Sequence, residues 1–270
     1  MIDAQTVRVA LSVSYSGSAY QGWQSQPSRQ TVQDQLELAL GRFSGQRVST
    51  LCAGRTDAGV HALMQVVHFD TCINRTEGAW VRGTNAFLNH DIAVQWARVV
   101  SPEFHCRASA LSRRYAYIVF NAPIRPSLDT GRVGWVGKPL DLDRMRLAAQ
   151  HLIGEHDFTS FRASACQALS PIKNLMHIDI TRRGAYWRFV FEANSFLHHM
   201  VRNLMGCLIM VGDGRRPPAW MVEVLAAKNR DAAAPTFSPH GLYFLGPRYD
   251  DRWGLPNDSG LLDGLPGATQ

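Results

Sequence analysis

The sequence predicts an α+β protein of two ferredoxin-like halves whose antiparallel sheets join. Segments that alternate apolar and polar residues are interrupted by segments with helical periodicity. The order strand, helix, strand, strand, helix, strand occurs in the first hundred residues and is echoed in the rest. The length of 270 residues is sufficient for one large domain or two modest ones with buried cores.

The first half begins with a clear strand. Val7 to Tyr15 alternates so that one face would be buried. Thr31 is a typical N-cap for the helix that follows, whose apolar residues from Val32 to Phe43 share one face. The remaining elements are expected as strands at 47–52 and 65–69, a helix at 80–88 and a strand at 93–100.

The second half repeats the order with longer connections. The elements expected there are a strand at 114–120, a helix at 141–152, a hairpin of strands 172–181 and 187–193, helices at 196–211 and 220–227, and a closing strand at 243–249. The last residues are rich in Gly and Pro. We therefore divide the chain into an N-terminal half at 1–104, a C-terminal half at 105–252 and a flexible tail at 253–270.

Hydropathy argues against a membrane protein and against a secreted one. Hydrophobic residues make up 46% of the chain, but no apolar run approaches the roughly 18 residues of a membrane span. The N-terminal stretch carries Asp3 and Arg8, which is untypical of a signal peptide. No membrane partner is expected.

Arginine dominates the positive charge. The formal net charge is +6, the sequence pI is about 9.3, and only three of the 28 Lys and Arg residues are lysines. A rigid, bidentate guanidinium suits phosphates and bases, so the composition favours a polyanionic partner. A GC-rich genome that encodes Arg in place of Lys would explain it equally well.

The five cysteines indicate a reducing compartment. Their number is odd and no two of them form a CxxC pair, so neither a disulfide framework nor a structural zinc site is expected. We expect a cytoplasmic protein.

Motifs for nucleotide cofactors and metals are missing. The sequence has no GxxxxGK[ST], HExxH or GxSxG pattern, and Gly212-Asp213-Gly214 lacks the third glycine of a dinucleotide fingerprint. His198 and His199 are adjacent on an expected helix, where their side chains would point about 100° apart and could not readily share an ion. We interpret both as packing or RNA-contact residues, and expect no metal and no cofactor.

One loop carries an unusual group of side chains. GRTDAGVHA, residues 54–62, lies between two expected strands and places Arg55, Asp57 and His61 within seven residues. Its glycines allow a sharp backbone path, and the preceding apolar strand would hold the side chains at the rim of a sheet. The alternative is an Asx-type turn with an incidental ion pair.

This loop resembles the signature of the tRNA pseudouridine synthase A family, in its bacterial branch, and the resemblance extends over nearly the whole chain. Six ordered blocks with similar spacing carry it, and together they are more specific than any one of them. The blocks are YSGSAYQGWQSQ at 15–26, GRTDAGVHA at 54–62, HCRASALSRRYAYIV at 105–119, GEHDFTSFRA at 154–163, NSFLHHMVRNLMG at 194–206 and GLYFLGPRYD at 241–250.

The resemblance implies a pseudouridine synthase fold and a tRNA partner. It implies an enzyme that isomerises uridine to pseudouridine at positions 38, 39 and 40 of the tRNA anticodon stem-loop. It also implies a homodimer that needs neither cofactor nor metal. The reaction breaks the N-glycosidic bond, turns the uracil and rejoins it through C5, so no energy carrier is consumed.

The family's site residues fall on five positions of this chain. Its invariant aspartate matches Asp57, and Arg202 matches the basic residue that pairs with it, since a desolvated carboxylate needs a cation to stay ionised. Arg55 resembles the residue that fills the space left by the flipped base, with a salt bridge to Asp57 as the alternative. Tyr115 matches a tyrosine that stacks on the uracil, and Leu242 an apolar pocket residue; core packing is the alternative for both.

Other positions extend the expected RNA contact. Arg113 and Arg114 are expected at phosphates. Trp23 and Gln24 are expected to shape an RNA-facing loop, with packing as the alternative for Trp23. Ser16 stands where the family usually has Asp, and we expect a local cost with retained activity.

Two other functions compete with this one. A non-catalytic RNA-binding protein on the same scaffold would use the arginines equally, but an acid such as Asp57 would repel phosphates. A glycoside or nucleoside hydrolase would need a second carboxylate a few ångströms from the first. Asp70, Glu155 and Asp157 have no motif support for that role.

Overall fold

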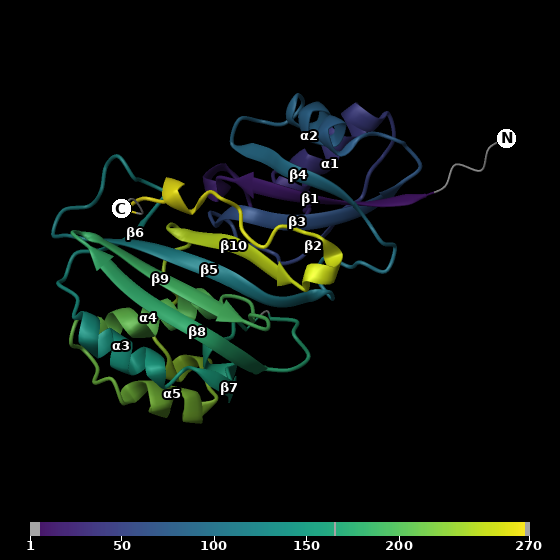
Figure 1. Ribbon diagram of the computed structural model, residues 1–270. Helices are drawn as coiled ribbons and strands as arrows, with labels where there is room; N and C mark the ends of the chain where they lie inside the picture. Colours follow the sequence, from purple (N-terminus) through teal and green to yellow (C-terminus); the bar gives the residue numbers. More distant parts are fainter. Residues whose placement is uncertain (1–5, 165, 268–270) are drawn as a thin grey trace. The chain divides into compact units, whose positions relative to one another are not determined.

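The computed structural model describes residues 6–164 and 166–267, which fold into two compact units (Figure 1). Unit 1 comprises the described residues of 1–111 and 244–261, and unit 2 those of 112–243 and 262–270. The expected α+β class is confirmed, because the described residues form one large sheet and five α-helices.

Unit 1 has the expected order of strand, helix, strand, strand, helix, strand. Its elements are β1 (Val7–Tyr15), α1 (Val32–Ser44), β2 (Leu51–Cys52), β3 (His61–Thr71), α2 (Glu77–Asn85) and β4 (Ile92–Val100). The strands follow the order β4-β1-β3, β2 pairs with β3, and these pairs are antiparallel. Helices α1 and α2 lie side by side on the sheet (Figure 1).

Local signals set the ends of α1 and β2. The Thr31 side chain caps α1 by accepting a hydrogen bond from the Asp34 N–H, as its position predicts. Strand β2 is shorter than the expected 47–52 because the backbone of Thr50 bonds to α1 instead. Its N–H donates to Glu37 Oε1 at 2.7 Å, and its carbonyl accepts from Gln33 at 3.1 Å.

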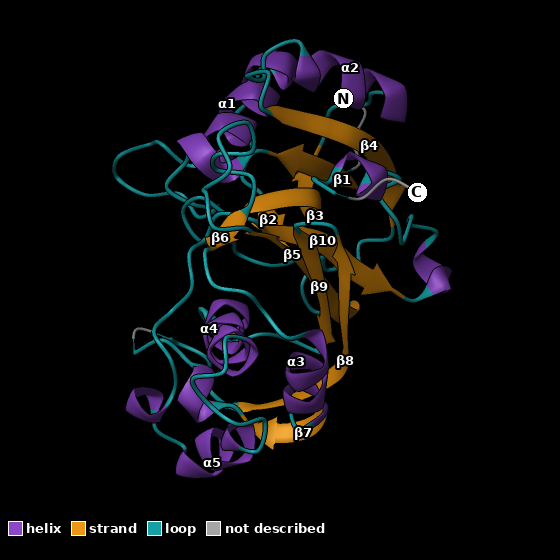
Figure 2. Cartoon of the chain, turned by 90° about the vertical axis from the view of Figure 1, so that its left-hand side faces the viewer, coloured by secondary structure: helices purple, strands orange, loops and turns teal. Residues whose placement is uncertain are grey.

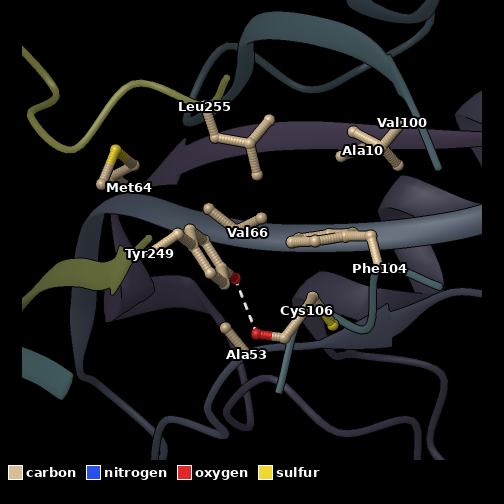
Figure 3. Close-up of a cluster of buried hydrophobic side chains, with 9 residues drawn as sticks. All are labelled: Ala10, Ala53, Met64, Val66, Val100, Phe104, Cys106, Tyr249 and Leu255. Carbon is tan, nitrogen blue, oxygen red and sulfur yellow. Dashed lines mark hydrogen bonds between the residues drawn. The ribbon is translucent and has the colours of Figure 1, made fainter. Parts of the chain in front are cut away.

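A cluster of buried side chains in unit 1 joins β1 and β3 to the segment after β4 and to the end of β10 (Leu242–Tyr249) (Figure 3). Within it, the Tyr249 hydroxyl donates to the Cys106 carbonyl at 2.6 Å. Leu255 also belongs to the cluster, and Asn257 bonds to both backbone groups of Tyr249. The start of the expected flexible tail is therefore packed against unit 1, because Leu255 is buried there and Asn257 is hydrogen-bonded to Tyr249.

Unit 2 carries strands on one side and helices on the other (Figure 2). Its elements are β5 (Ala110–Asn121), β6 (Gly134–Val136), α3 (Leu142–Gln150), β7 (Gly154–Asp157), β8 (Ile172–Arg183), β9 (Tyr186–Ala193), α4 (Met200–Gly212) and α5 (Trp220–Ala227). The strand order is β5-β9-β8-β7, with antiparallel pairs, and β6 pairs with β5 in parallel.

Three features of unit 2 differ from expectation. Strands β6 and β7 are absent from the sequence-based order because each has four residues or fewer and shows little alternation. Helix α4 begins at Met200 rather than at residue 196. The reason is His199, which precedes the helix with φ 62 in the left-handed region.

None of the helices in the described part of the chain is long and apolar enough to cross a membrane.

Candidate active site

The loop that carries Asp57 joins β2 to β3 in unit 1, and buried polar side chains hold it on both sides. The Gln65 side chain is fully buried and bonds to both backbone groups of Gly54. The Tyr15 hydroxyl contacts the Thr56 hydroxyl at 2.8 Å. The Val60 N–H donates to the Asp57 carbonyl at 3.1 Å and closes a tight turn. Asp57 itself is half-buried.

Two glycines let neighbouring backbone approach this loop. A Cβ on Gly17 would overlap the Val60 carbonyl oxygen, and a Cβ on Gly22 would lie 2.7 Å from the Thr56 oxygen. Gly22 also has φ 86, a conformation that L side chains rarely adopt. The Trp23 N–H donates to the Thr56 carbonyl at 3.0 Å, so the chain after Gly22 is tied to the loop. Backbone contacts therefore fix the position of Asp57.

Arg55, within this loop, is exposed. Across the described residues, its guanidinium makes no hydrogen bond or ion pair. The alternative of a salt bridge to Asp57 is therefore not realised, and the side chain is available to a ligand.

The loop after β1 is supported by a buried tryptophan. Trp23 is 1% exposed and packs against Tyr15 with ring centroids 5.8 Å apart, as the packing alternative describes. Gln24 beside it is half-buried. Ser16 is exposed and makes no side-chain cap to the short 3₁₀ turn that follows, although its N–H donates to the Asp91 carbonyl.

The remaining candidates lie in unit 2. Tyr115 on β5 is buried and meets Phe196 edge-on, with ring centroids 5.1 Å apart. Arg113 on the same strand donates to the Asn194 carbonyl at 3.0 Å, and Arg114 is half-buried. Strand β5 therefore presents the two arginines and the tyrosine in succession.

Arg202 lies in the first turn of α4. Its Nε donates to the Phe237 carbonyl at 2.9 Å, and its own carbonyl accepts the Phe237 N–H. The side chain is half-buried on a helix that is otherwise almost fully buried. Leu242, the first residue of β10, is 4% exposed.

The histidine pair does not lie on the expected helix. His198 and His199 precede α4, and their rings are tilted relative to each other with centroids 4.0 Å apart. Helical spacing therefore does not separate these two side chains, contrary to the expectation from the sequence.

A second group with metal-ligand chemistry lies in unit 1. The candidate ligand atoms of His68, His105 and Cys106 lie within 4.8 Å of one another. However, Nδ1 of His68 accepts the Cys106 N–H, and Nδ1 of His105 accepts those of Arg107 and Ala108. The Nδ1 lone pairs of both rings are therefore already engaged by backbone N–H groups of the protein.

Comparisons with known proteins agree with the sequence blocks. A family model described as tRNA pseudouridine synthase matches residues 11–107 and 148–250. The tRNA pseudouridine synthase A of Albidiferax ferrireducens is 69% identical over 96% of this chain and 100% of its own length. Those of Polaromonas naphthalenivorans and Paracidovorax citrulli are 64% and 63% identical, each over 96% of this chain and 100% of their own. The chain belongs to the tRNA pseudouridine synthase family.

The family match covers the two parts of the chain unequally. The segments of the tRNA pseudouridine synthase model contain Asp57, Arg202 and Leu242, whereas residues 108–147, with Arg113 and Tyr115, lie outside them. The motif at residues 54–62 makes Asp57 a candidate but does not reveal the residues that position its loop, such as Gln65 and Tyr15. Tyr15 and Gly17 lie inside the first of the six blocks, at 15–26. The block therefore marks these positions, but the sequence does not show that they support the Asp57 loop.

Proposed function

We propose that this protein isomerises uridine to pseudouridine at positions 38, 39 and 40 of the tRNA anticodon stem-loop. The observation that carries the proposal is Asp57, a half-buried carboxylate on a loop with fixed backbone, in a chain of the tRNA pseudouridine synthase family. Relatives at 60–69% identity are tRNA pseudouridine synthase A enzymes.

The reaction needs little beyond one carboxylate and a shaped pocket. The bond between N1 and C1′ breaks, a bond between C5 and C1′ forms, the C5 hydrogen leaves as a proton and N1 takes up a proton, so atoms and charge balance without a co-reactant. We propose that Asp57 supplies the carboxylate and Arg202 a cation that pairs with it. Tyr115 and Leu242 provide apolar faces against which the uracil can lie, and Arg113 and Arg114 bind phosphates.

We propose that Arg55 fills the stem when the target base leaves it. Its exposed and unpaired guanidinium supports this role. Unstacking costs least for a base that is already mismatched. Arg55→Ala should therefore slow isomerisation of a paired uridine more than ten-fold, and a mismatch opposite the target should restore most of the rate. Equal losses on paired and mismatched substrates would contradict base replacement by Arg55.

The decisive experiment is tritium release from tRNA transcripts labelled at C5 of uridine. The wild type should release tritium, Asp57→Asn should release none, and replacement of U38, U39 and U40 should abolish the signal. Asp70→Asn is the matched control, because Asp70 is an exposed acid of the same unit that pairs with Arg8. Tight tRNA binding without release by the wild type would show a non-catalytic RNA-binding protein instead.

We further propose a homodimer in the cytoplasm. The dimer rests on the family resemblance, and the reducing compartment on five cysteines that are all free. Sedimentation should give twice the chain mass of 30.1 kDa. A monomer that retains full activity would overturn the dimer, and a fluorescent fusion outside the cytoplasm would overturn the location.

A further inference from the structure

A hollow of about 750 Å³ lies on the outer side of α1 in unit 1. It runs from the turn before the helix to the loop that follows it, and its charged rim is formed by Arg29, Arg42 and Arg47. Two acids, Asp34 and Glu37, also reach its wall. The balance of these charges decides which ligand the hollow could take.

The two acids are occupied by the protein's own donors. Burial alone would raise the pKa of Asp34, but hydrogen bonds from Ser25, Thr31 and Arg29 outweigh it and lower that pKa. Glu37 Oε1 accepts hydrogen bonds from Thr50 and Gln33, at 2.7–2.9 Å. The carboxylate oxygens are therefore bonded to the protein's own donors inside the wall, although these hydrogen bonds do not remove the negative charges.

The arginines face the solvent instead. Arg42 and Arg47 are exposed, and within the described part of the chain neither guanidinium has a hydrogen-bond or ion-pair partner. The Arg29 side chain is 73% exposed even though it bonds to Asp34 at 3.2 Å. Its backbone has φ 57, a left-handed conformation that is uncommon for a non-glycine residue. The open side of the hollow thus carries two arginines, Arg42 and Arg47, that have no acidic partner within the described residues.

The hollow is connected to the loop that carries Asp57. The first N–H of α1, on Val32, donates to the Gly22 carbonyl. The residue after Gly22 is Trp23, and its N–H donates to the Thr56 carbonyl in the Asp57 loop. At 1.5 Å per residue, Arg42 lies about 15 Å farther along the helix axis. One strand of B-form DNA advances about 3.4 Å per base pair and an A-form RNA helix advances less, so this distance spans several nucleotides.

From these observations we propose that the α1 hollow binds the sugar–phosphate backbone of the substrate tRNA, several nucleotides from the base held at Asp57. The inference rests on the proposed tRNA isomerase function. The ligand is a phosphodiester strand, because exposed guanidinium groups without acidic partners match phosphates in charge and geometry. Such a contact contributes to affinity and carries no sequence information.

The test compares two double variants of equal charge. Arg42→Ala with Arg47→Ala removes the hollow's unpaired cations. Arg75→Ala with Arg82→Ala removes two exposed cations of the same unit outside it. Arg42 and Arg82 are matched further, since each lies in the last turn of its helix. Circular dichroism melting should show that both double variants are folded.

The hollow variant should raise the KM for tRNA about ten-fold in the tritium-release assay and leave kcat unchanged. Its plot of log Kd for tRNA against log salt concentration should be shallower by about 2, one unit for each lost phosphate contact. The control pair should keep the wild-type KM and slope.

Three outcomes would overturn the proposal. If the hollow variant keeps the wild-type KM and the wild-type salt slope, the hollow does not contact the tRNA backbone. Equal effects in both pairs would indicate a general charge effect, and a change in sedimentation mass would assign the hollow to an interface between copies. If the wild type itself releases no tritium, the proposed function fails first, which separates that failure from the others.

Discussion

The two units hold their candidate site residues in different ways. In unit 1, Asp57 lies on a loop that is fixed by backbone contacts at Gly17 and Gly22. In unit 2, Tyr115 and Arg202 lie on β5 and α4, where the packing of regular elements fixes them. The loop needs glycine at positions 17 and 22, where any side chain would collide with neighbouring backbone. The strand and the helix instead need large side chains that fill the core. Substitutions should therefore affect the two units by different routes.

The largest effect is expected at Gly17. Gly17→Ala would place a methyl group on the Val60 carbonyl oxygen, and backbone cannot give way as a flexible side chain can. We expect a loss of about 3 kcal/mol in the free energy of unfolding and a loss of tritium release. Gly264→Ala in unit 2 is the control, because a Cβ there meets nothing within 4 Å. Urea unfolding measures both, and equal stabilities would show that the loop tolerates side chains after all.

Acid should destabilise unit 1 through His68. Burial lowers the pKa of His68 to about 4 from 6.5, so between these values the unfolded chain binds a proton that the folded protein excludes. Stability should then fall as pH is lowered from 6.5 to 4, by on the order of 2 kcal/mol. The free energy of urea unfolding across this range should lose this slope in His68→Gln and keep it in His151→Gln, an exposed histidine of unit 2. The same slope in both variants would assign the acid sensitivity elsewhere.

An effect of intermediate size is expected at two tyrosines, one in each unit. Tyr15 bonds to the Thr56 hydroxyl beside Asp57, and Tyr243 bonds to the Arg132 carbonyl in unit 2. Replacing either by Phe leaves a polar partner unsatisfied and should cost about 1 kcal/mol. Only Tyr15→Phe should also lower kcat, because it alone loosens the Asp57 loop. An unchanged kcat in Tyr15→Phe would mean that the glycine contacts suffice.

The sequence predicted those parts of the fold that local patterns determine. Strand β1 and helix α5 have the predicted ends, and α1 begins after the predicted cap at Thr31. Strand β6 could not be predicted, because three residues become a strand only by pairing with β5. The start of α4 was missed because it depends on the left-handed backbone of His199, which no periodicity reveals.

The candidate site divides in the same way. A short motif was sufficient to propose Asp57 as a candidate, since residue types and spacing carry that signal. The direction of the Trp23 side chain was not predictable, because it follows from the positive φ of Gly22 and from packing against Tyr15. The link between Gln65 and Gly54 likewise exists only once β3 has folded beside the loop.

The smallest effect is expected where neither kind of support is involved. Arg8 and Asp70 form an ion pair between β1 and β3, at 2.7 Å, with the Asp70 side chain 49% exposed. Solvent screens such a pair, and Arg8 keeps its bonds to the carbonyls of Pro102 and Phe104 when the acid is removed. Asp70→Asn should therefore cost less than about 1 kcal/mol in urea unfolding, and less still at 1 M salt. A loss as large as that in Gly17→Ala would show that unit 1 depends on surface charge as much as on the close approach of its backbone.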